Sequence, residues 1–91
     1  MDIVFDDAKD RRNTQERGLP FARAADFAFE SALFEIDNRQ DYGENRIRAL
    51  GYMDGKLHAL VFTETATGIR VISFRRANKR ENDLYEKATQ I

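Results

Sequence analysis

Several residue types that carry common chemistries are absent or nearly absent. The 91-residue sequence has no cysteine, which excludes disulfides, thiolate catalysis and cysteine-ligated zinc. Its one histidine, His58, cannot form a histidine-rich metal site or a two-histidine acid–base pair. No apolar run approaches the roughly 20 residues of a membrane-spanning helix, and the acidic start MDIVFDDAKD lacks the layout of a signal peptide. We therefore expect no metal, no cofactor, no membrane partner and a cytoplasmic location.

The sequence also lacks an excess of charge of either sign. Lys and Arg total 15 against 16 Asp and Glu, so the net charge of −1 gives no global electrostatic argument for nucleic-acid binding. The charges are unevenly distributed, however. Residues 26–44 contain six acidic residues and one basic residue, whereas residues 70–80 contain five basic residues and no acidic one. A nucleic-acid site must therefore rest on local clustering, and residues 70–80 are the first candidate.

The first third of the sequence predicts a strand and two helices. A short apolar run at residues 3–5 precedes a polar helix at 8–17, for which Asp6 offers an N-cap oxygen and Gly18 a left-handed end. A second helix is expected at roughly 20–30. Its apolar positions follow helical spacing at Phe21, Ala24, Ala25, Ala28 and Phe29, with Phe27 off this stripe.

The remaining residues predict four antiparallel strands and a final helix. The strands are expected at residues 33–36, 46–53, 57–63 and 69–75, with a polar loop at 37–45. Asp54-Gly55 is a two-residue hairpin signal, and Asn78 with Glu81 resembles a capping box at the start of the last helix, whose apolar face has Leu84, Tyr85 and Ala88. The prediction is one α+β domain over residues 1–91, with helices packed on one face of the sheet.

The hairpin at residues 54–55 sorts the strand side chains onto two faces. The more apolar set, assigned to the helix-covered core, is Ile47, Ala49, Met53, His58, Leu60 and Phe62. The open face has Arg46, Arg48, Leu50, Tyr52, Ala59 and Val61. If Thr63 pairs with Ile69, then Val71, Ser73 and Arg75 join the open face. A slip of one residue would instead send Arg75 to the core face.

The basic residues at 70–80 lie where a strand ends and a helix begins. Guanidinium groups and free backbone N–H groups that converge on one place favour a bound phosphate. The alternative is a solvated basic face, although basic charge at a helix N-terminus opposes the helix dipole. His58 fits a packed or rim position better than a catalytic one, and Tyr85 is either a packing residue or a functional phenol.

Three blocks of the sequence resemble BrnT-type toxins of bacterial type II toxin–antitoxin modules over nearly the whole chain. They are DDAKDRRNTQERGLPF, in which Lys9, Asn13, Gly18 and Phe21 fit the family's spacing, then RALGYMDGKLHALVFTE, and IRVISFRRANKRENDLYE, the most specific block. One departure stands out. The family commonly has Lys-His before the first helix's glycine, where this sequence has Glu16 and Arg17, so no role of that histidine is carried over.

The resemblance implies a RelE-like fold and a ribonuclease that blocks translation. It also implies neutralisation by a BrnA-type antitoxin with a DNA-binding domain, so that contact with DNA is indirect. RelE-like enzymes cleave RNA with Arg, Lys, Tyr or Glu side chains, often without histidine.

Metal-free cleavage requires a deprotonated 2′-OH, a stabilised pentavalent phosphate and a protonated 5′-oxygen. We assign Arg48 and Arg75 as transition-state clamps and Tyr85 as a general acid or base if it reaches the open face. Glu81 is an alternative base, although helix capping explains it more simply. The expected RNA-binding residues are Arg46, Arg76, Lys79 and Arg80.

A non-catalytic module remains the alternative, including an inactivated toxin homologue. The basic block would then pair with an acidic partner segment or bind nucleic acid without cleaving it. Both hypotheses expect a partner, because an open sheet with exposed side chains such as Leu50 and Tyr52 invites a covering helix. A purely structural protein ranks last.

Overall fold

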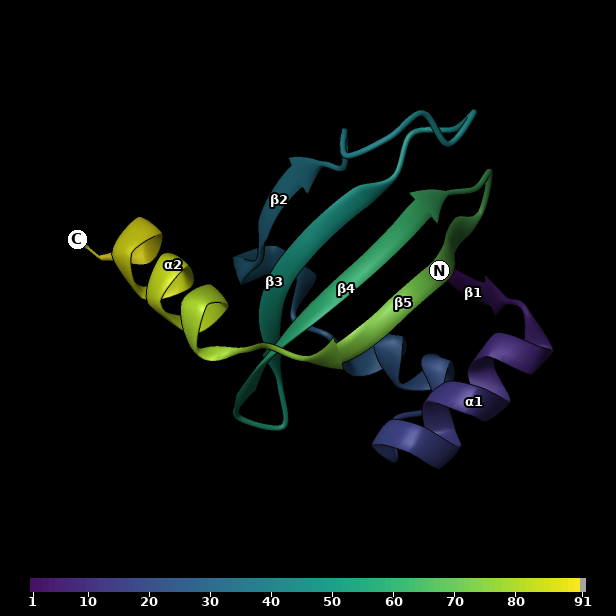
Figure 1. Cartoon of the computed structure of the whole chain (residues 1–91), viewed down its shortest axis with the longest axis horizontal. Coiled ribbons are helices and arrows are strands. Elements are labelled where there is room, and N and C mark those ends of the chain that lie inside the picture. Colours follow the sequence, from purple (N-terminus) through teal and green to yellow (C-terminus); the bar gives the residue numbers. More distant parts are fainter. Residues whose placement is uncertain (91) are drawn as a thin grey trace.

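The chain forms one sheet with helices at its flanks. A computed structural model describes residues 1–90. Its elements are β1 (Asp2–Phe5), α1 (Asp7–Arg17), the 3₁₀ helices η1 (Phe21–Asp26) and η2 (Phe29–Ser31), β2 (Leu33–Ile36), β3 (Ile47–Met53), β4 (Lys56–Glu64), β5 (Gly68–Arg76) and α2 (Lys79–Thr89). The predicted α+β class is confirmed. The four predicted strands pair antiparallel, and β1 adds a fifth strand because it pairs in parallel with β5. The strand order of the sheet is β1-β5-β4-β3-β2 (Figure 1).

Helix α1 begins and ends as its flanking residues predict. The Asp6 carboxylate accepts from the Lys9 N–H at 3.0 Å, and Gly18 adopts φ 64° while its N–H donates to the Thr14 carbonyl. The one buried residue of the helix is Asn13. Its Nδ2 donates to the carbonyls of Leu19 (2.7 Å) and Phe74 (2.9 Å). A polar side chain therefore attaches this polar helix to β5.

The predicted α-helix over residues 20–30 is wrong: the segment forms two short 3₁₀ helices. A 3₁₀ helix has three residues per turn, so Phe21, Ala24 and Phe27 fall on one side, and all three are buried. Ala25 is exposed instead. Phe27, placed off the predicted stripe, lies in the core over Gly51, where an added Cβ would come within 2.5 Å of the ring.

The core lies on the face of the sheet predicted from the hairpin register. Met53 pairs with Lys56 and Tyr52 with Leu57, as expected. The predicted core-face residues Ala49, Met53, His58, Leu60 and Phe62 are buried, and Ile47 packs against them. The opposite face of β3, β4 and β5 is not overlain by α1 or α2 in the face-on view of Figure 1.

A β-bulge decides which residues of β5 reach the open face. Thr63 pairs with Arg70, not with Ile69, so Val71 lies opposite Phe62 and is buried in the core. The expected open-face position of Val71 is therefore wrong. The register then shifts between Val61 and Phe62, which puts Ser73 opposite Val61 and Arg75 opposite Ala59. Both residues consequently occupy the open face, as predicted.

Helix α2 starts with the predicted capping box and is attached to the sheet by few contacts. Asn78 accepts from the Glu81 N–H at 2.8 Å, and Glu81 accepts from the Asn78 N–H at 3.0 Å. Tyr85 is the buried residue of the helix, and its ring packs edge-on against Tyr52 at 5.3 Å between centroids. Neither α-helix of residues 1–90 is long and apolar enough to cross a membrane.

Candidate functional site

The open face has a groove in which guanidinium groups gather. It encloses about 180 Å³ over β3, β4 and β5, with short or apolar side chains such as Ala59 and Val61 beneath it. Its charged lining, called here the arginine groove, consists of Arg39, Arg46, Arg48 and Arg75 with Asp37 and Glu81. Larger depressions of about 460 and 550 Å³ lie elsewhere, but the first is lined by one arginine and the second by none.

Strand alternation places the two predicted clamp residues on the same face. Arg48 on β3 lies opposite Val61, and Arg75 on β5 lies opposite Ala59, so the two arginines flank β4 diagonally. Neighbouring strands are about 4.8 Å apart, so the backbones of β3 and β5 are separated by roughly 10 Å. Two extended arginine side chains can therefore converge above the small residues of β4.

The Arg75 guanidinium is held by a carboxylate from the first turn of α2. Its two terminal nitrogens donate to the two oxygens of Glu81 at 2.7 and 2.9 Å, a fork-to-fork pair. This hydrogen bonding raises the pKa of Arg75 and, with the Asn78 N–H, lowers the pKa of Glu81. Glu81 is thus an ionised carboxylate of low basicity, and its capping role is the one that the geometry displays.

Arg48 is held from the neighbouring edge strand. It forms an ion pair with Glu35 of β2, the strand that pairs with β3. The Nε–H of Arg48 is buried and has no hydrogen-bond acceptor within residues 1–90. Buried donors are rarely left without a partner, so this guanidinium retains unused hydrogen-bonding capacity inside the groove.

The loop between β2 and β3 adds an arginine that was not predicted as a site residue. Arg39 donates from Nε and NH2 to both oxygens of Asp37 at 2.8 Å, and the Tyr42 hydroxyl donates to the same carboxylate at 3.4 Å. The Asp37 side chain is 1% exposed, whereas that of Arg39 is 63% exposed. Mainly because of the Arg39 hydrogen bonds, the pKa of Asp37 falls to about 2.

The expected single cluster at residues 70–80 is divided by the structure. Arg75 reaches the groove, but Arg76 lies opposite His58 and so points to the other face of β5. Lys79 and Arg80 are exposed in the first turn of α2 and are not part of the groove lining, and Lys79 pairs with Asp83 at 2.9 Å. The remaining basic residue, Arg70, donates to both oxygens of Glu44.

The structure brings together three predicted residues and leaves Tyr85 apart from them. Arg46, Arg48 and Arg75 all line the groove. Tyr85 is buried, is absent from the lining, and donates its hydroxyl to the Ser31 carbonyl at 2.8 Å. Its catalytic assignment stays a prediction, which now requires the hydroxyl to leave Ser31.

His58 occupies the packed position that was favoured for it. The ring lies 5.6 Å from that of Phe74, and its Nδ1–H donates to the Lys56 carbonyl at 2.8 Å. Burial lowers its pKa. The side chain faces the core and takes no part in the groove.

Sequence reasoning missed Arg39 and Asp37 as groove residues. A usable signal was present, because Arg39 is the one base in the acidic segment 26–44 and stands two residues after Asp37. Short Asp-x-Arg spacing in a loop allows a local fork pair. The position of the loop over β3 could not be read from that spacing.

The arginine groove has the chemistry of an anion site. Four guanidinium groups and two carboxylates line the groove, and Glu35 and Glu44 pair with Arg48 and Arg46 from outside the lining. Guanidinium forks match phosphate oxygens as well as they match carboxylate oxygens. A phosphate diester can therefore share or displace the carboxylates that now hold the arginines.

Comparison with known proteins agrees with this chemistry. The family model described as the ribonuclease toxin BrnT of type II toxin–antitoxin systems matches residues 5–81, which include every charged residue of the groove. No curated protein matches the chain. Since the matched segment spans most of the 91 residues, the chain belongs to the BrnT family of ribonuclease toxins, whose type II systems pair such a toxin with an antitoxin.

Proposed function

We propose that this chain cleaves RNA without a metal ion at a phosphate bound in the arginine groove. The cleavage would block translation in the cytoplasm, and a BrnA-type antitoxin would neutralise it. The observation that carries the proposal is the gathering of Arg39, Arg46, Arg48 and Arg75 on one uncovered sheet face. Each of these arginines is oriented by a carboxylate: Asp37, Glu44, Glu35 and Glu81, respectively. A bound phosphate would share or displace these carboxylates.

Arg48 and Arg75 are assigned to the transition state. In cleavage by the neighbouring 2′-OH, negative charge builds up on the phosphate oxygens as the phosphorus becomes pentavalent. Two guanidinium groups that reach over β4 from opposite strands can donate to those oxygens from both sides. The small side chains of Ala59 and Val61 between them let the phosphate approach the sheet.

The other predicted residues have outer roles. Arg46 lines the groove and would contact the RNA backbone. Lys79 and Arg80, exposed at the start of α2, would contact the RNA beyond Arg75. Arg76 faces the other side of β5 and is assigned to RNA that passes around the strand end. Tyr85 and Glu81 remain the candidates for proton transfer.

The proposal is tested with Arg48→Ala and Arg75→Ala in an RNA-cleavage assay that contains a chelator. Each variant loses a transition-state clamp, so we expect a cost on the order of 3 kcal/mol, about a hundredfold in rate. Arg12→Ala, an exposed change on α1, is the matched control and should leave the rate unchanged. If both groove variants still cleave RNA and arrest growth like the wild type, the site assignment is wrong.

A non-catalytic module is the second candidate. Arg39, Arg48 and Arg75 already hold carboxylates, so the same groove could hold acidic side chains of a partner protein. The same assay separates the two functions. Tight RNA binding, or antitoxin binding, without any cleavage by the pure protein would favour the module over the enzyme.

A further inference from the structure

We propose that the loop at residues 37–45, together with Arg46 that follows it, is a nucleotide-binding arm of the groove, in which the stacked side chains of Tyr42 and Arg46 hold a base of single-stranded RNA. Arg39 would bind the phosphate next to that base. The inference rests on the proposed function and extends the RNA site by a nucleotide away from the phosphate between Arg48 and Arg75. It assigns a specificity-determining role to a segment with no regular secondary structure.

A buried carboxylate holds the arm in place. Asp37 accepts from Nε and NH2 of Arg39 at 2.8 Å, from the Arg39 backbone N–H at 3.3 Å and from the Tyr42 hydroxyl at 3.4 Å. The Asp37 N–H donates to the Arg46 carbonyl at 2.7 Å, which continues the β2–β3 pairing by one step. The Asp37 side chain therefore holds Arg39 and Tyr42, and its backbone N–H joins the two ends of the arm, so little of the arm's ordering has to occur when a ligand binds.

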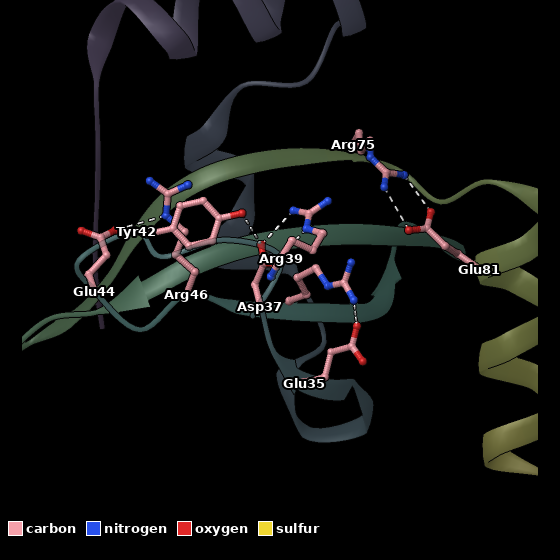
Figure 2. A network of polar contacts seen from close by, with 9 residues as sticks. Glu35, Asp37, Arg39, Tyr42, Glu44, Arg46, Arg75 and Glu81 are labelled. Carbon is pink, nitrogen blue, oxygen red and sulfur yellow. Dashed lines mark hydrogen bonds and ion pairs between the residues drawn. The ribbon is translucent and has the colours of Figure 1, made fainter.

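Tyr42 stacks against Arg46, which also lines the groove. The Arg46 guanidinium lies over the Tyr42 ring at 4.0 Å from its centroid, and the ring is partly exposed. Figure 2 shows this stack at one end of the row of charged side chains, with the Arg75–Glu81 pair at the other end. Unpaired RNA bases stack on aromatic rings and on guanidinium planes, so a base can extend the stack.

The ion pair between Arg70 and Glu44 joins the outer edge of the arm to β5. Glu44 accepts from Arg70 of β5 at 2.6 and 2.7 Å and from Nε of Arg46 at 3.3 Å. These bonds join the loop to the strand that also carries Arg75. The stack and the clamp residues are therefore built on the same sheet.

The flat surface of the arm, more than its charge, favours RNA over an acidic protein segment. Arg39 and Arg46 both face the groove, and each is oriented by one carboxylate of the same loop. An acidic peptide needs only the charges, whereas a nucleotide uses the charges and the flat surface together. The flat surface is what makes a base, with its two π-faces, the better fit.

The test measures binding of a short single-stranded RNA with methylated 2′-oxygens, which lacks the 2′-OH needed for cleavage. Tyr42→Leu removes the ring and should weaken the affinity about tenfold, within the 1–3 kcal/mol of base stacking. Tyr42→Phe keeps the ring and removes only the long hydrogen bond to Asp37, so it should lose much less affinity than Tyr42→Leu. Gln15→Ala, an exposed change on α1 away from the groove, is the control and should bind normally.

Salt dependence separates the phosphate contact from the stacking contact. Arg39→Ala should lower the slope of log affinity against log salt by about 0.7, the value for one phosphate of a single strand. Tyr42→Leu should leave this slope unchanged, since the ring carries no charge.

The outcomes distinguish this inference from the proposed function. If the wild type cleaves RNA but Tyr42→Leu binds the methylated RNA as tightly as the wild type, the nucleotide-binding arm is refuted while the ribonuclease stands. If binding depends on Tyr42 but unmodified RNA is never cleaved, the arm stands and the ribonuclease proposal fails. If the wild type does not bind the methylated RNA, the arm is refuted. Equal losses in Tyr42→Phe and Tyr42→Leu would also refute stacking.

Discussion

At the scale of single residues, the arginines of the groove are oriented before any ligand arrives. Arg75 is held by Glu81, Arg39 by Asp37 and Arg48 by Glu35. An arginine side chain has many rotamers, and fixing them on binding costs free energy. The carboxylates restrict these rotamers before binding, which reduces that cost. They also compete with the phosphate for the same N–H donors.

Replacing Tyr85 by phenylalanine tests whether its hydroxyl has a structural or a chemical role. The hydrogen bond to the Ser31 carbonyl would be lost, so we expect a loss of about 1 kcal/mol in the free energy of unfolding with cleavage retained. Tyr52→Phe is the control, because the exposed Tyr52 donates no side-chain hydrogen bond within residues 1–90. A large fall in cleavage rate with an intact fold would instead assign the Tyr85 phenol to catalysis.

His58 should make the folded state sensitive to mild acid. Burial lowers its pKa in the folded protein, so below the ordinary histidine pKa of 6.5 the unfolded chain binds a proton that the folded chain does not. Stability from this residue is therefore complete above about pH 7 and is lost as the pH falls through 6.5.

Urea unfolding near pH 7.5 and near pH 5.5 provides the measurement, with His58→Phe as the comparison. The midpoint of the wild type should fall between these pH values by more than that of the variant, because phenylalanine does not titrate. Parallel shifts in both proteins would show that another group is responsible.

At the scale of elements, packing against the sheet fixes the form of the segment after α1. Phe27 packs edge-on against Phe29 at 4.9 Å and against Phe74 at 6.2 Å between ring centroids. The three-residue repeat of a 3₁₀ helix brings Phe27 to this position above Gly51. A weakly amphipathic sequence thus adopts the helix type that fills the core.

Gly51→Ala should be destabilising by about 1–3 kcal/mol, because the new methyl group meets the Phe27 ring at 2.5 Å and the ring is enclosed by other aromatics. Thermal or urea unfolding measures the loss. Combining it with Phe27→Leu, which shortens the obstructing side chain, should cost less than the sum of the two single changes. Strict additivity would contradict the proposed clash.

At the scale of the whole molecule, the groove and its surroundings form an uncovered surface. Tyr52 is 40% exposed and Leu84 is 55% exposed, and both lie near the end of the groove where α2 leaves the sheet. Exposed apolar side chains beside a charged groove are typical of a surface that a partner covers.

The antitoxin should therefore bind the toxin stably and shield the groove. Size-exclusion chromatography of the chain with the product of the neighbouring gene should show one co-eluting complex, and the complex should cleave RNA far more slowly than the free chain. Separate elution of the two proteins at micromolar concentration would contradict this expectation.

Much of the fold followed from local patterns. Asp6, Gly18, Asp54-Gly55 and the Asn78–Glu81 capping box act through their own backbone neighbours, so their effects could be predicted without tertiary information. The groove was predicted only in part. Arg48 follows from strand alternation and Arg75 reaches the same face through the bulge, whereas Arg39 belongs to a loop that holds the buried Asp37.

The sequence alone determined the helix caps, the hairpin and the two faces of β3 and β4, because each depends on residues a few positions apart. Tertiary structure decided the rest. The bulge that returns Arg75 to the open face arises from the pairing of two whole strands, and the 3₁₀ turns arise from the space above Gly51. The arginine groove belongs to this second class, since β3, β5, α2 and the loop at 37–45 meet there only when the sheet has formed.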